Sequence, residues 1–519
     1  MTNDRSQIYF SDAFEVSPSV LEEYGAFDVS LLNDLPLFID PFLLFNSSDS
    51  EYQGLHAEII KYLCFLRDKA VAGAVPKGLL EAWFTFREVK QNWLGYSLTG
   101  NGGTGLGTDF ANALSTALAS HFKSFGSETL TRSSHLEKLC LIGSGVGRDN
   151  ISDLSTNLIK DFLLRYSQTF ARTHLRPDQR RRIQVPKVVF NFNTETWETR
   201  TYELPFIGGD YVLLTPTDLL TKDDVWINRA DMVRGCEAVV DAVPNEQLRD
   251  QLSNYFVATL SEILKRDQPA DGPARKRRRK PKAKQPTARQ RAEAVDRLIR
   301  GHPEFIDYYI RWKEDSGDEA EAQADARVRA SEGLYITRVR NLVTTLLQTT
   351  EFYRSAGTTK EEARQRVEYL KDVIENKGGW RIFYAEGAPI RRESDLHILF
   401  RLTWCNTPSD VNREVNNGRG PSDFEVSRGR FDKSVVEFKL AKSTSLERNL
   451  KYQAEIYQKA SGAGHALKVV VYFSLEELRR TEGILRRLGL FESPDVVLID
   501  ARRDNKQSAS LVDGPSDEE

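Results

Sequence analysis

Two short segments near the C-terminus constrain the fold of this chain most strongly, because together they predict a β-hairpin that carries charged residues. Residues 418–424 (GRGPSDF) end a turn-rich stretch, and residues 435–440 (VVEFKL) place charged side chains between apolar ones. Turn-forming residues lie between the two segments. Side chains alternate between the two faces of a strand, so Glu437 and Lys439 share one face, and strand pairing brings Asp423 to that face.

This set of charges predicts a metal site suited to the hydrolysis of phosphodiesters. The carboxylates of Asp423 and Glu437, with a backbone carbonyl near residue 438, are ligands of the kind that Mg²⁺ prefers. A bound divalent cation acidifies a water ligand and neutralises charge on a phosphate. Lys439 can orient that water or stabilise the transition state as a compact positive charge. The same residues also fit an exposed hairpin with ordinary surface charges.

A helix is predicted shortly after the hairpin, and two polar residues lie on its otherwise apolar face. These are Gln453 and Tyr457. A buried amide or phenol needs a hydrogen-bond partner, which a metal-bound water, Lys439 or a phosphate can supply, although backbone carbonyls can do so too. Arg448 and Lys451 lie on another face, where they can contact a phosphate backbone or water.

The charged residues of the hairpin resemble a known catalytic motif. Pro421-Ser422-Asp423 and Glu437-Phe438-Lys439 resemble the two parts of the motif in the PD-(D/E)XK superfamily of restriction-endonuclease-like nucleases, and Gln453-x-x-x-Tyr457 resembles an extra motif of exonuclease-like branches. The resemblance covers roughly residues 385–500. It implies a mixed central sheet flanked by helices, Mg²⁺ as cofactor with Mn²⁺ able to substitute, and catalytic roles for Asp423, Glu437, Lys439, Gln453 and Tyr457.

The resemblance also implies a helix, often bearing a glutamate, before the first core strand. Glu393, at the start of a predicted helix, is the first candidate for a third acidic ligand, and Glu414, in a strand-like segment, is the second. The sequence leaves both open. Farther along, the β-branched run at 466–473 and the apolar run at 496–499 predict further strands, and Ser474 is a predicted helix cap.

Length and composition predict several domains, and the alternation of predicted strands and helices predicts an overall α/β class. The chain has 519 residues, of which 40% are hydrophobic, enough for two to four domains with real cores. Changes in composition place the boundaries as follows: a mixed α/β or α+β domain for recognition or sensing at 1–266, a basic flexible linker at 267–290, a helical connector at 291–380, the nuclease domain at 381–505, and a disordered tail at 506–519.

The linker holds the strongest concentration of positive charge in the chain. The net charge of the whole chain, −3, argues against a basic surface overall, so nucleic acid would have to meet a local patch. A tether that binds phosphates by counterion release and a solvated spacer are both compatible with this segment. Its candidate phosphate-binding residues are Arg275, Lys276, Arg277, Arg278, Arg279 and Lys280.

Other features predict a soluble protein of the cytoplasm. The sequence contains no run of about 18 apolar residues that could span a bilayer, and its start lacks the apolar core of a signal peptide. The four cysteines are far apart without a C-x-x-C pair, so we expect reduced thiols rather than disulfides or a zinc ribbon.

The expected function is metal-dependent cleavage of nucleic acid, with DNA as the expected substrate. The N-terminal half also resembles, more faintly, large uncharacterised bacterial proteins associated with phage-defence genes. That resemblance implies a role in defence or restriction and a partner protein from a defence operon. Two alternatives stay open: a non-catalytic nucleic-acid-binding or scaffold protein, and a nuclease gated by a ligand or partner bound to the N-terminal domain. A homo-oligomer is compatible with double-strand cleavage.

Overall fold

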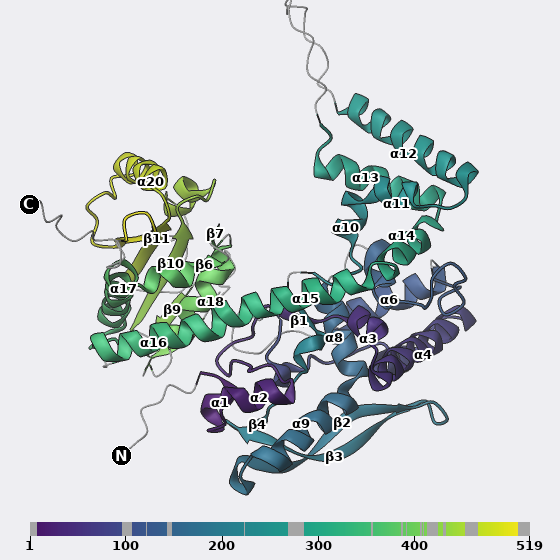
Figure 1. The fold of residues 1–519 in the computed structure, drawn as a ribbon, viewed down its shortest axis with the longest axis horizontal. Helices are drawn as coiled ribbons and strands as arrows, with labels where there is room; N and C mark the ends of the chain where they lie inside the picture. The colour runs from purple at the N-terminus through teal and green to yellow at the C-terminus, as the bar shows by residue number, and fades with distance from the viewer. Residues whose placement is uncertain are drawn as a thin grey trace, which may run out of the picture.

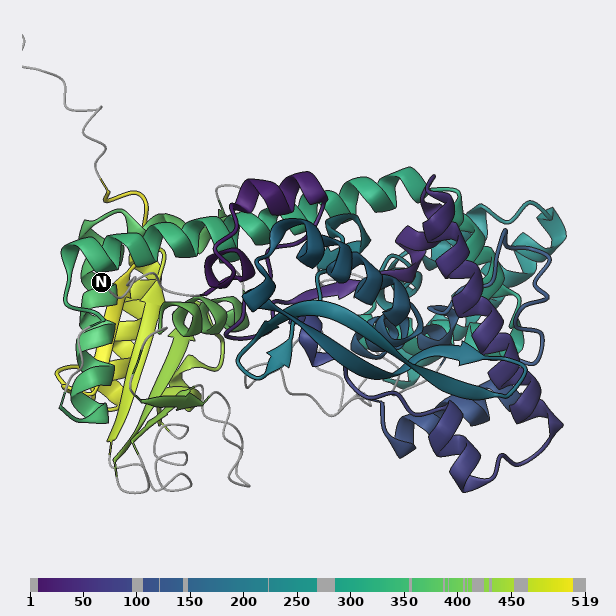
Figure 2. The same ribbon diagram turned by 90° about the horizontal axis from the view of Figure 1, so that it is seen from below.

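The structure is a computed structural model, and a long helical segment joins its N-terminal and C-terminal bodies (Figures 1 and 2). In this segment α15 (Gly317–Glu332), the π-helical turn η4 (Gly333–Thr337) and α16 (Arg338–Thr349) follow one another without a break. The structure describes residues 8–95, 106–120, 122–142, 148–222, 224–267, 285–353, 357–385, 388–390, 392–404, 407, 409–412, 424–428, 432–451 and 465–506.

The N-terminal body combines helices with small antiparallel sheets, which confirms a mixed α/β class. A long hairpin of β2 (Arg180–Asn191) and β3 (Thr196–Ile207) continues into β4 (Asp210–Tyr211), while β1 (Leu37–Ile39) pairs with β5 (Leu220–Lys222). The helices of this body are α1 (Phe10–Ala13), α2 (Pro18–Tyr24), α3 (Pro41–Asn46), α4 (Ser50–Ala72), α5 (Lys77–Trp83), α6 (Thr108–Ser120), α7 (Lys138–Ile142), α8 (Arg148–Leu158) and α9 (Lys160–His174).

A group of helices follows these sheets and leads into the long helical segment. Within it α12 and α13 pack side by side, although residues 268–284 between them lie outside the described residues. In the part of the chain that the structure describes, no helix has both the length and the apolar character needed to cross a membrane. The helices of this group are α10 (Arg229–Arg234), α11 (Cys236–Asp241), α12 (Glu246–Arg266), α13 (Ala288–Gly301) and α14 (Phe305–Glu314).

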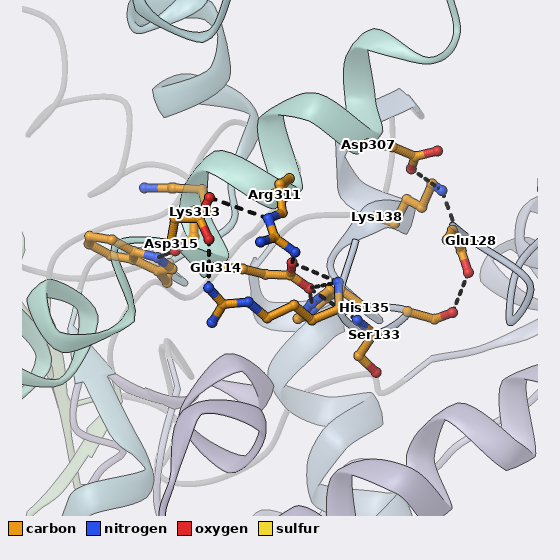
Figure 3. Close-up of polar contacts among 12 residues, drawn as sticks. Glu128, Ser133, His135, Lys138, Asp307, Arg311, Lys313, Glu314 and Asp315 are labelled. Carbon is orange, nitrogen blue, oxygen red and sulfur yellow. Dashed lines mark hydrogen bonds and ion pairs between the residues drawn. The ribbon is translucent and has the colours of Figure 1, made fainter. Parts of the chain in front are cut away.

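A buried carboxylate fastens this helical group to the N-terminal body (Figure 3). Glu314, the last residue of α14, is 1% exposed and accepts hydrogen bonds from the backbone amides of Arg132 (2.9 and 2.8 Å) and Ser133 (3.1 Å). His135 Nε2 lies 2.9 Å from Glu314 Oε1, and both side chains are fully buried. The carboxylate therefore compensates for its loss of water by ordering a loop that comes from a distant part of the chain.

A second histidine is buried beside His135. His56 in α4 is 4% exposed, its ring lies 5.5 Å from that of His135, and its Nε2 makes no hydrogen bond within the described residues. Burial, helped by the neighbouring His135, lowers the pKa of His56 to about 3. An unfolded histidine has a pKa near 6.5, so between these values the unfolded chain binds a proton that the folded chain excludes. His56 therefore stabilises the fold above about pH 6.5, and this contribution is lost as the pH falls.

Acidification from pH 7 to pH 5 is expected to lower the free energy of unfolding by roughly 2 kcal/mol through His56 alone. In His56→Phe the ring still packs against Phe45 but no longer titrates, so the pH dependence should shrink by that amount. Urea unfolding at both pH values measures it, with exposed His174→Gln as the control. The buried carboxyls of Asp40 and Glu137 are present in all three proteins, so their contributions to the pH dependence cancel when the proteins are compared. Equal pH dependence of wild type and His56→Phe would contradict this account.

The C-terminal body is built around a five-stranded mixed sheet in the order β12-β11-β10-β9-β8. The neighbours of β10 are antiparallel β9 and parallel β11. The strands are β8 (Asp410–Asn412), β9 (Phe424–Ser427), β10 (Lys433–Leu440), β11 (His465–Tyr472) and β12 (Val496–Asp500), beside a small β6 (Tyr384–Ala385) and β7 (Ala388–Pro389) pair. The predicted hairpin and the predicted strands near 466–473 and 496–499 are confirmed.

Helices lie against both faces of this sheet. On one face, α17 (Thr359–Asn376) and α18 (Glu393–Thr403) contact β10, and Phe438 packs 4.2 Å from Phe400, measured between ring centroids. On the other face, Leu446 and Leu450 form a core with Val470 and with α20 (Leu475–Arg487). Ser474 caps α20 by accepting a hydrogen bond from the amide of Glu477, as predicted. Strand β10 is therefore buried on both sides.

The thiols that the structure describes are free, as expected from their spacing. Cys64, Cys140 and Cys236 form no disulfide, and Cys405 lies outside the described residues. Burial raises the pKa of the Cys236 thiol to about 12, so this cysteine is a buried apolar side chain and not a reactive thiolate.

Candidate active site

The β9–β10 hairpin places the predicted charged residues on one face of the central strand. Its register pairs Phe424 with Val436 and Glu425 with Val435. Because side chains alternate along β10, Phe438 enters the aromatic core beside α18 while Glu437 and Lys439 point to the opposite face. Both charged residues are nonetheless buried, with exposed fractions of 3% and 6%. Charged groups are buried to this degree when other charges or hydrogen bonds compensate for the lost water.

Two carboxylates converge on the ammonium group of Lys439. Its Nζ lies 3.4 Å from Glu437 Oε2 on the same strand and 3.7 Å from Glu393 Oε2 at the start of α18. The second oxygen of Glu393 is held by the backbone amide of Leu440, at 3.4 Å. The first candidate for a third acidic residue thus lies beside the predicted pair, brought there by a helix about 45 residues upstream.

The position of α18 is fixed by contacts that surround Glu393. His397 Nε2, one helical turn later, lies 3.4 Å from the carbonyl oxygen of Phe438. The hydroxyl of Tyr335, in the π-helical turn η4, donates a hydrogen bond of 2.5 Å to Asp395 Oδ1. The hydroxyl of Tyr9 in turn donates to the backbone oxygen of Tyr335. A chain of buried hydrogen bonds therefore connects the N-terminal body to the helix that carries Glu393.

A separate buried network fixes the hairpin itself. Glu362 in α17 pairs with Arg366 (3.1 Å) and with Arg428 (2.6 Å), which directly follows β9. It also accepts hydrogen bonds from the hydroxyls of Thr407 and Ser409, both at 2.5 Å. These bonds bring α17, the approach to β8 and the end of β9 together, so the strand that carries Glu437 and Lys439 has a rigid neighbour.

A further buried acidic residue on this face of the hairpin, which was not predicted from sequence, pairs with Lys433. Glu425 is 3% exposed, and its pairing with Val435 places it on the same face as Glu437. Its Oε1 accepts a hydrogen bond of 2.9 Å from Lys433, while its Oε2 accepts none within the described residues. The alternation of Phe424, Glu425 and Val426 between apolar and acidic side chains was the signal that could have identified it.

Several other predicted site residues lie outside the part of the chain that the structure describes. Asp423, Glu414, Gln453 and Tyr457 lie outside the described residues, as do Arg275 to Lys280 of the basic segment. Of the predicted phosphate-binding residues that the structure describes, Arg448 and Lys451 are exposed near the start of the helix after β10. In the described part of the chain, no cluster of three or more His, Cys, Asp or Glu residues has the arrangement of a metal site.

The described groups at this place supply oxygen donors. The carboxylates of Glu393, which is 29% exposed, and of Glu437, which is 4% exposed, lie 3.7 and 3.4 Å from the Lys439 ammonium. Carboxylate oxygens are ligands of the kind that a hard divalent cation takes. The residues present therefore fit Mg²⁺ by the chemistry of their donor atoms.

Two segments of the chain match families that have no assigned activity. Residues 15–228 match a domain of unknown function (DUF8370), and residues 359–475 match another (DUF8371). No curated protein and no solved structure matches the chain. The DUF8371 segment runs from the start of α17 to the first residue of α20 and so contains Glu393, Glu437 and Lys439, while the DUF8370 segment ends just before α10. The described residues of the candidate active site thus lie within the second match and outside the first.

Proposed function

We propose that the C-terminal body is a metal-dependent nuclease of the restriction-endonuclease-like kind. The observation that carries this proposal is the convergence of Glu393 and Glu437 on the buried ammonium of Lys439. A Glu-x-Lys sequence alone is common, but its burial in the central strand, with a second carboxylate delivered from another element, is the environment in which titratable groups perform chemistry.

The order of elements supports the proposal. Helix α18 precedes the first core strand and carries a glutamate at its start, as the motif resemblance implies. The β8, β9 and β10 strands then form an antiparallel meander, and β11 adds in parallel to β10 after a helical segment. Helices on both faces complete a mixed sheet of the kind expected.

Glu393 and Glu437, with Asp423, are the proposed ligands of Mg²⁺. Asp423 directly precedes Phe424 in the sequence, and Phe424 pairs with Val436, the neighbour of Glu437. Mg²⁺ bound there supplies an acidified water and neutralises charge on the phosphate. Gln453 and Tyr457 are proposed to orient this site from the helix after β10.

Lys439 is the residue proposed to stabilise negative charge on the reacting phosphate. Its ammonium is positioned by two carboxylates and needs no reorganisation to stabilise negative charge that develops on a phosphate oxygen or on the attacking water. Glu437 on the same face and Glu393 on α18 place their negative charges beside it, at 3.4 and 3.7 Å. These residues thus hold a positive charge at a defined place between β10 and the start of α18.

DNA is the proposed substrate, and defence against foreign DNA is the proposed role. The basic residues Arg275 to Lys280, with exposed Arg448 and Lys451, supply positive charge for a phosphate backbone in a chain whose net charge is −3. The role in defence rests on the resemblance of the N-terminal half alone.

The test is cleavage of supercoiled plasmid, linear DNA and single-stranded RNA by the full chain with Mg²⁺, Mn²⁺ or a chelator. We expect cutting of DNA that requires the metal and falls by about 10²-fold or more in Asp423→Ala. Asp504→Ala, which removes an exposed carboxylate near the end of the described chain, is the control and should cut normally. Binding of DNA without cutting under every condition would point instead to a non-catalytic binding module.

A further inference from the structure

A cavity of about 460 Å³ lies between the N-terminal body and α15, far from β10 in the sequence. Its wall combines the loop between α3 and α4 with residues of α4, α9, the short helix η3 (Thr217–Leu219) and α15. The volume falls in the range of sites for small molecules or for single side chains of a partner. Nothing in the proposed nuclease uses this cavity.

Aromatic rings in fixed positions form one part of the wall. Tyr24 and Tyr166 each donate a hydrogen bond from the hydroxyl to the backbone oxygen of the other, at 2.8 and 3.0 Å, and their ring centroids are 4.6 Å apart. Gly25 lines the cavity beside them with a φ of +78°, a conformation that favours glycine. Tyr52 donates from its hydroxyl to Asp218 Oδ1 at 3.0 Å. These rings are therefore held in place before any ligand arrives.

Carboxylates form the other part of the wall. Asp218, Glu321 and Asp325 line the cavity, and none of its described lining residues is a lysine, arginine or histidine. Arg329, 75% exposed, pairs with Asp325 at 2.8 Å, and Glu321 accepts a hydrogen bond from the neutral amide of Asn46. Asp218 and Glu321 thus keep a net negative charge at the cavity.

The pKa of Asp218 reflects the negative charge at the cavity. Loss of water around its carboxyl raises the pKa of Asp218, and the negative charges of Asp49 and Glu321 raise it further, while the hydrogen bond from Tyr52 acts in the opposite direction. A cation in the cavity would relieve the repulsion among these carboxylates. Aromatic faces beside carboxylates attract organic ammonium and guanidinium groups in particular, because both the rings and the anions stabilise a positive charge.

We propose that this cavity binds an organic cation with ammonium or guanidinium groups, recognised by the rings of Tyr24, Tyr52 and Tyr166 and by the carboxylates of Asp218 and Glu321. Such a group is present both in a free polyamine and in the lysine or arginine side chain of a partner protein. Because α15 continues through η4 into α16, the ligand would contact the same helix that reaches the C-terminal body (Figure 1). Binding is independent of the nuclease activity proposed above.

The test titrates the full chain with spermidine, with a triarginine peptide and with triacetylspermidine, using calorimetry at physiological salt. Triacetylspermidine keeps the chain of spermidine but lacks its charges. We expect saturable binding of at least one of the two cations and none of the neutral compound. Spermidine alone would identify a free polyamine as the ligand class, and triarginine alone would identify a side chain of a partner.

Matched variants on α15 place the binding in the cavity. Glu321→Gln/Asp325→Asn removes two lining charges from exposed side chains, and Asp318→Asn/Glu319→Gln removes two exposed charges from the first turn of the same helix, away from the lining. The first pair should weaken binding about tenfold or more, and the second should leave it nearly unchanged. No saturable binding of either cation, equal weakening by both pairs, or equal binding of the neutral compound would overturn the proposal.

Discussion

Lys439→Ala is expected to reduce metal-dependent cleavage by about 10²- to 10³-fold. The substitution removes the ammonium group that lies 3.4 Å from Glu437 and 3.7 Å from Glu393, and with it the positive charge proposed for the reacting phosphate. It also takes this counter-charge away from the buried carboxylate of Glu437, so we expect a lower melting temperature without metal and partial recovery when Mg²⁺ is added. Single-turnover cleavage of plasmid and thermal melts with and without Mg²⁺ measure both effects.

The same strand offers a matched control. Lys433 lies on β10 six residues before Lys439, on the same face, and pairs at 2.9 Å with the buried Glu425. Lys433→Ala therefore removes a partly buried lysine that pairs with a glutamate, as Lys439→Ala does, but it leaves the proposed site intact. The cleavage rate of this variant should stay within about threefold of wild type. If both lysine variants lose activity equally, Lys439 acts through the stability of the strand and not on the phosphate.

A second pair of variants tests the carboxylates in the same way. Glu437→Gln should lose cleavage as Lys439→Ala does, because an amide is a poor ligand for Mg²⁺, and the loss should not be restored by higher metal concentration alone. Glu425→Gln, on the neighbouring strand, should retain cleavage. Binding of a labelled DNA duplex in chelator should be similar in all of these proteins, which separates loss of chemistry from loss of substrate. Equal activity of wild type and Glu437→Gln would remove the proposed site.

The geometry of the hairpin was predictable because it depends on short-range rules. The two-residue period of a strand determines that Glu437 and Lys439 share a face, and the turn residues after Ser427 determine which strands pair. The position of Glu393 at the start of a helix was also readable from the local sequence. What the local sequence could not determine was whether Glu393 or Glu414 belongs to the site. The structure places Glu393 beside Lys439, and Glu414 lies outside the described residues.

Contacts between distant segments could not be predicted in this way. The chain of hydrogen bonds from Tyr9 through Tyr335 to Asp395 spans most of the sequence. Each of these residues has an ordinary local pattern that fits many environments. Only packing of the whole chain decides which polar groups become buried together, and no repeat or motif marks them beforehand.

Glu314→Ala is expected to lower the free energy of unfolding of the N-terminal body by about 3–5 kcal/mol. Glu314 and His135 are fully buried, and the same carboxylate accepts from two backbone amides of the loop at 132–133 (Figure 3). Truncation to alanine removes the acceptor and takes the hydrogen bonds away from these part-buried donors and from the buried His135, which is costlier than losing an exposed contact. Urea unfolding followed by helical circular dichroism measures the loss.

The adjacent residue supplies the control for this prediction. Asp315 is 49% exposed and pairs at 2.6 Å with the side chain of Arg132, in the same loop that Glu314 contacts. Asp315→Asn therefore removes a surface carboxylate that contacts this loop, and it should lower the free energy of unfolding by less than about 1 kcal/mol. Hydrogen exchange gives an independent readout, because the amides of Arg132 and Ser133 should lose protection in Glu314→Ala and keep it in Asp315→Asn. If the two variants are equally stable, the carboxylate of Glu314 does not fasten α14 to the N-terminal body, since burial then adds nothing to what an exposed pair contributes.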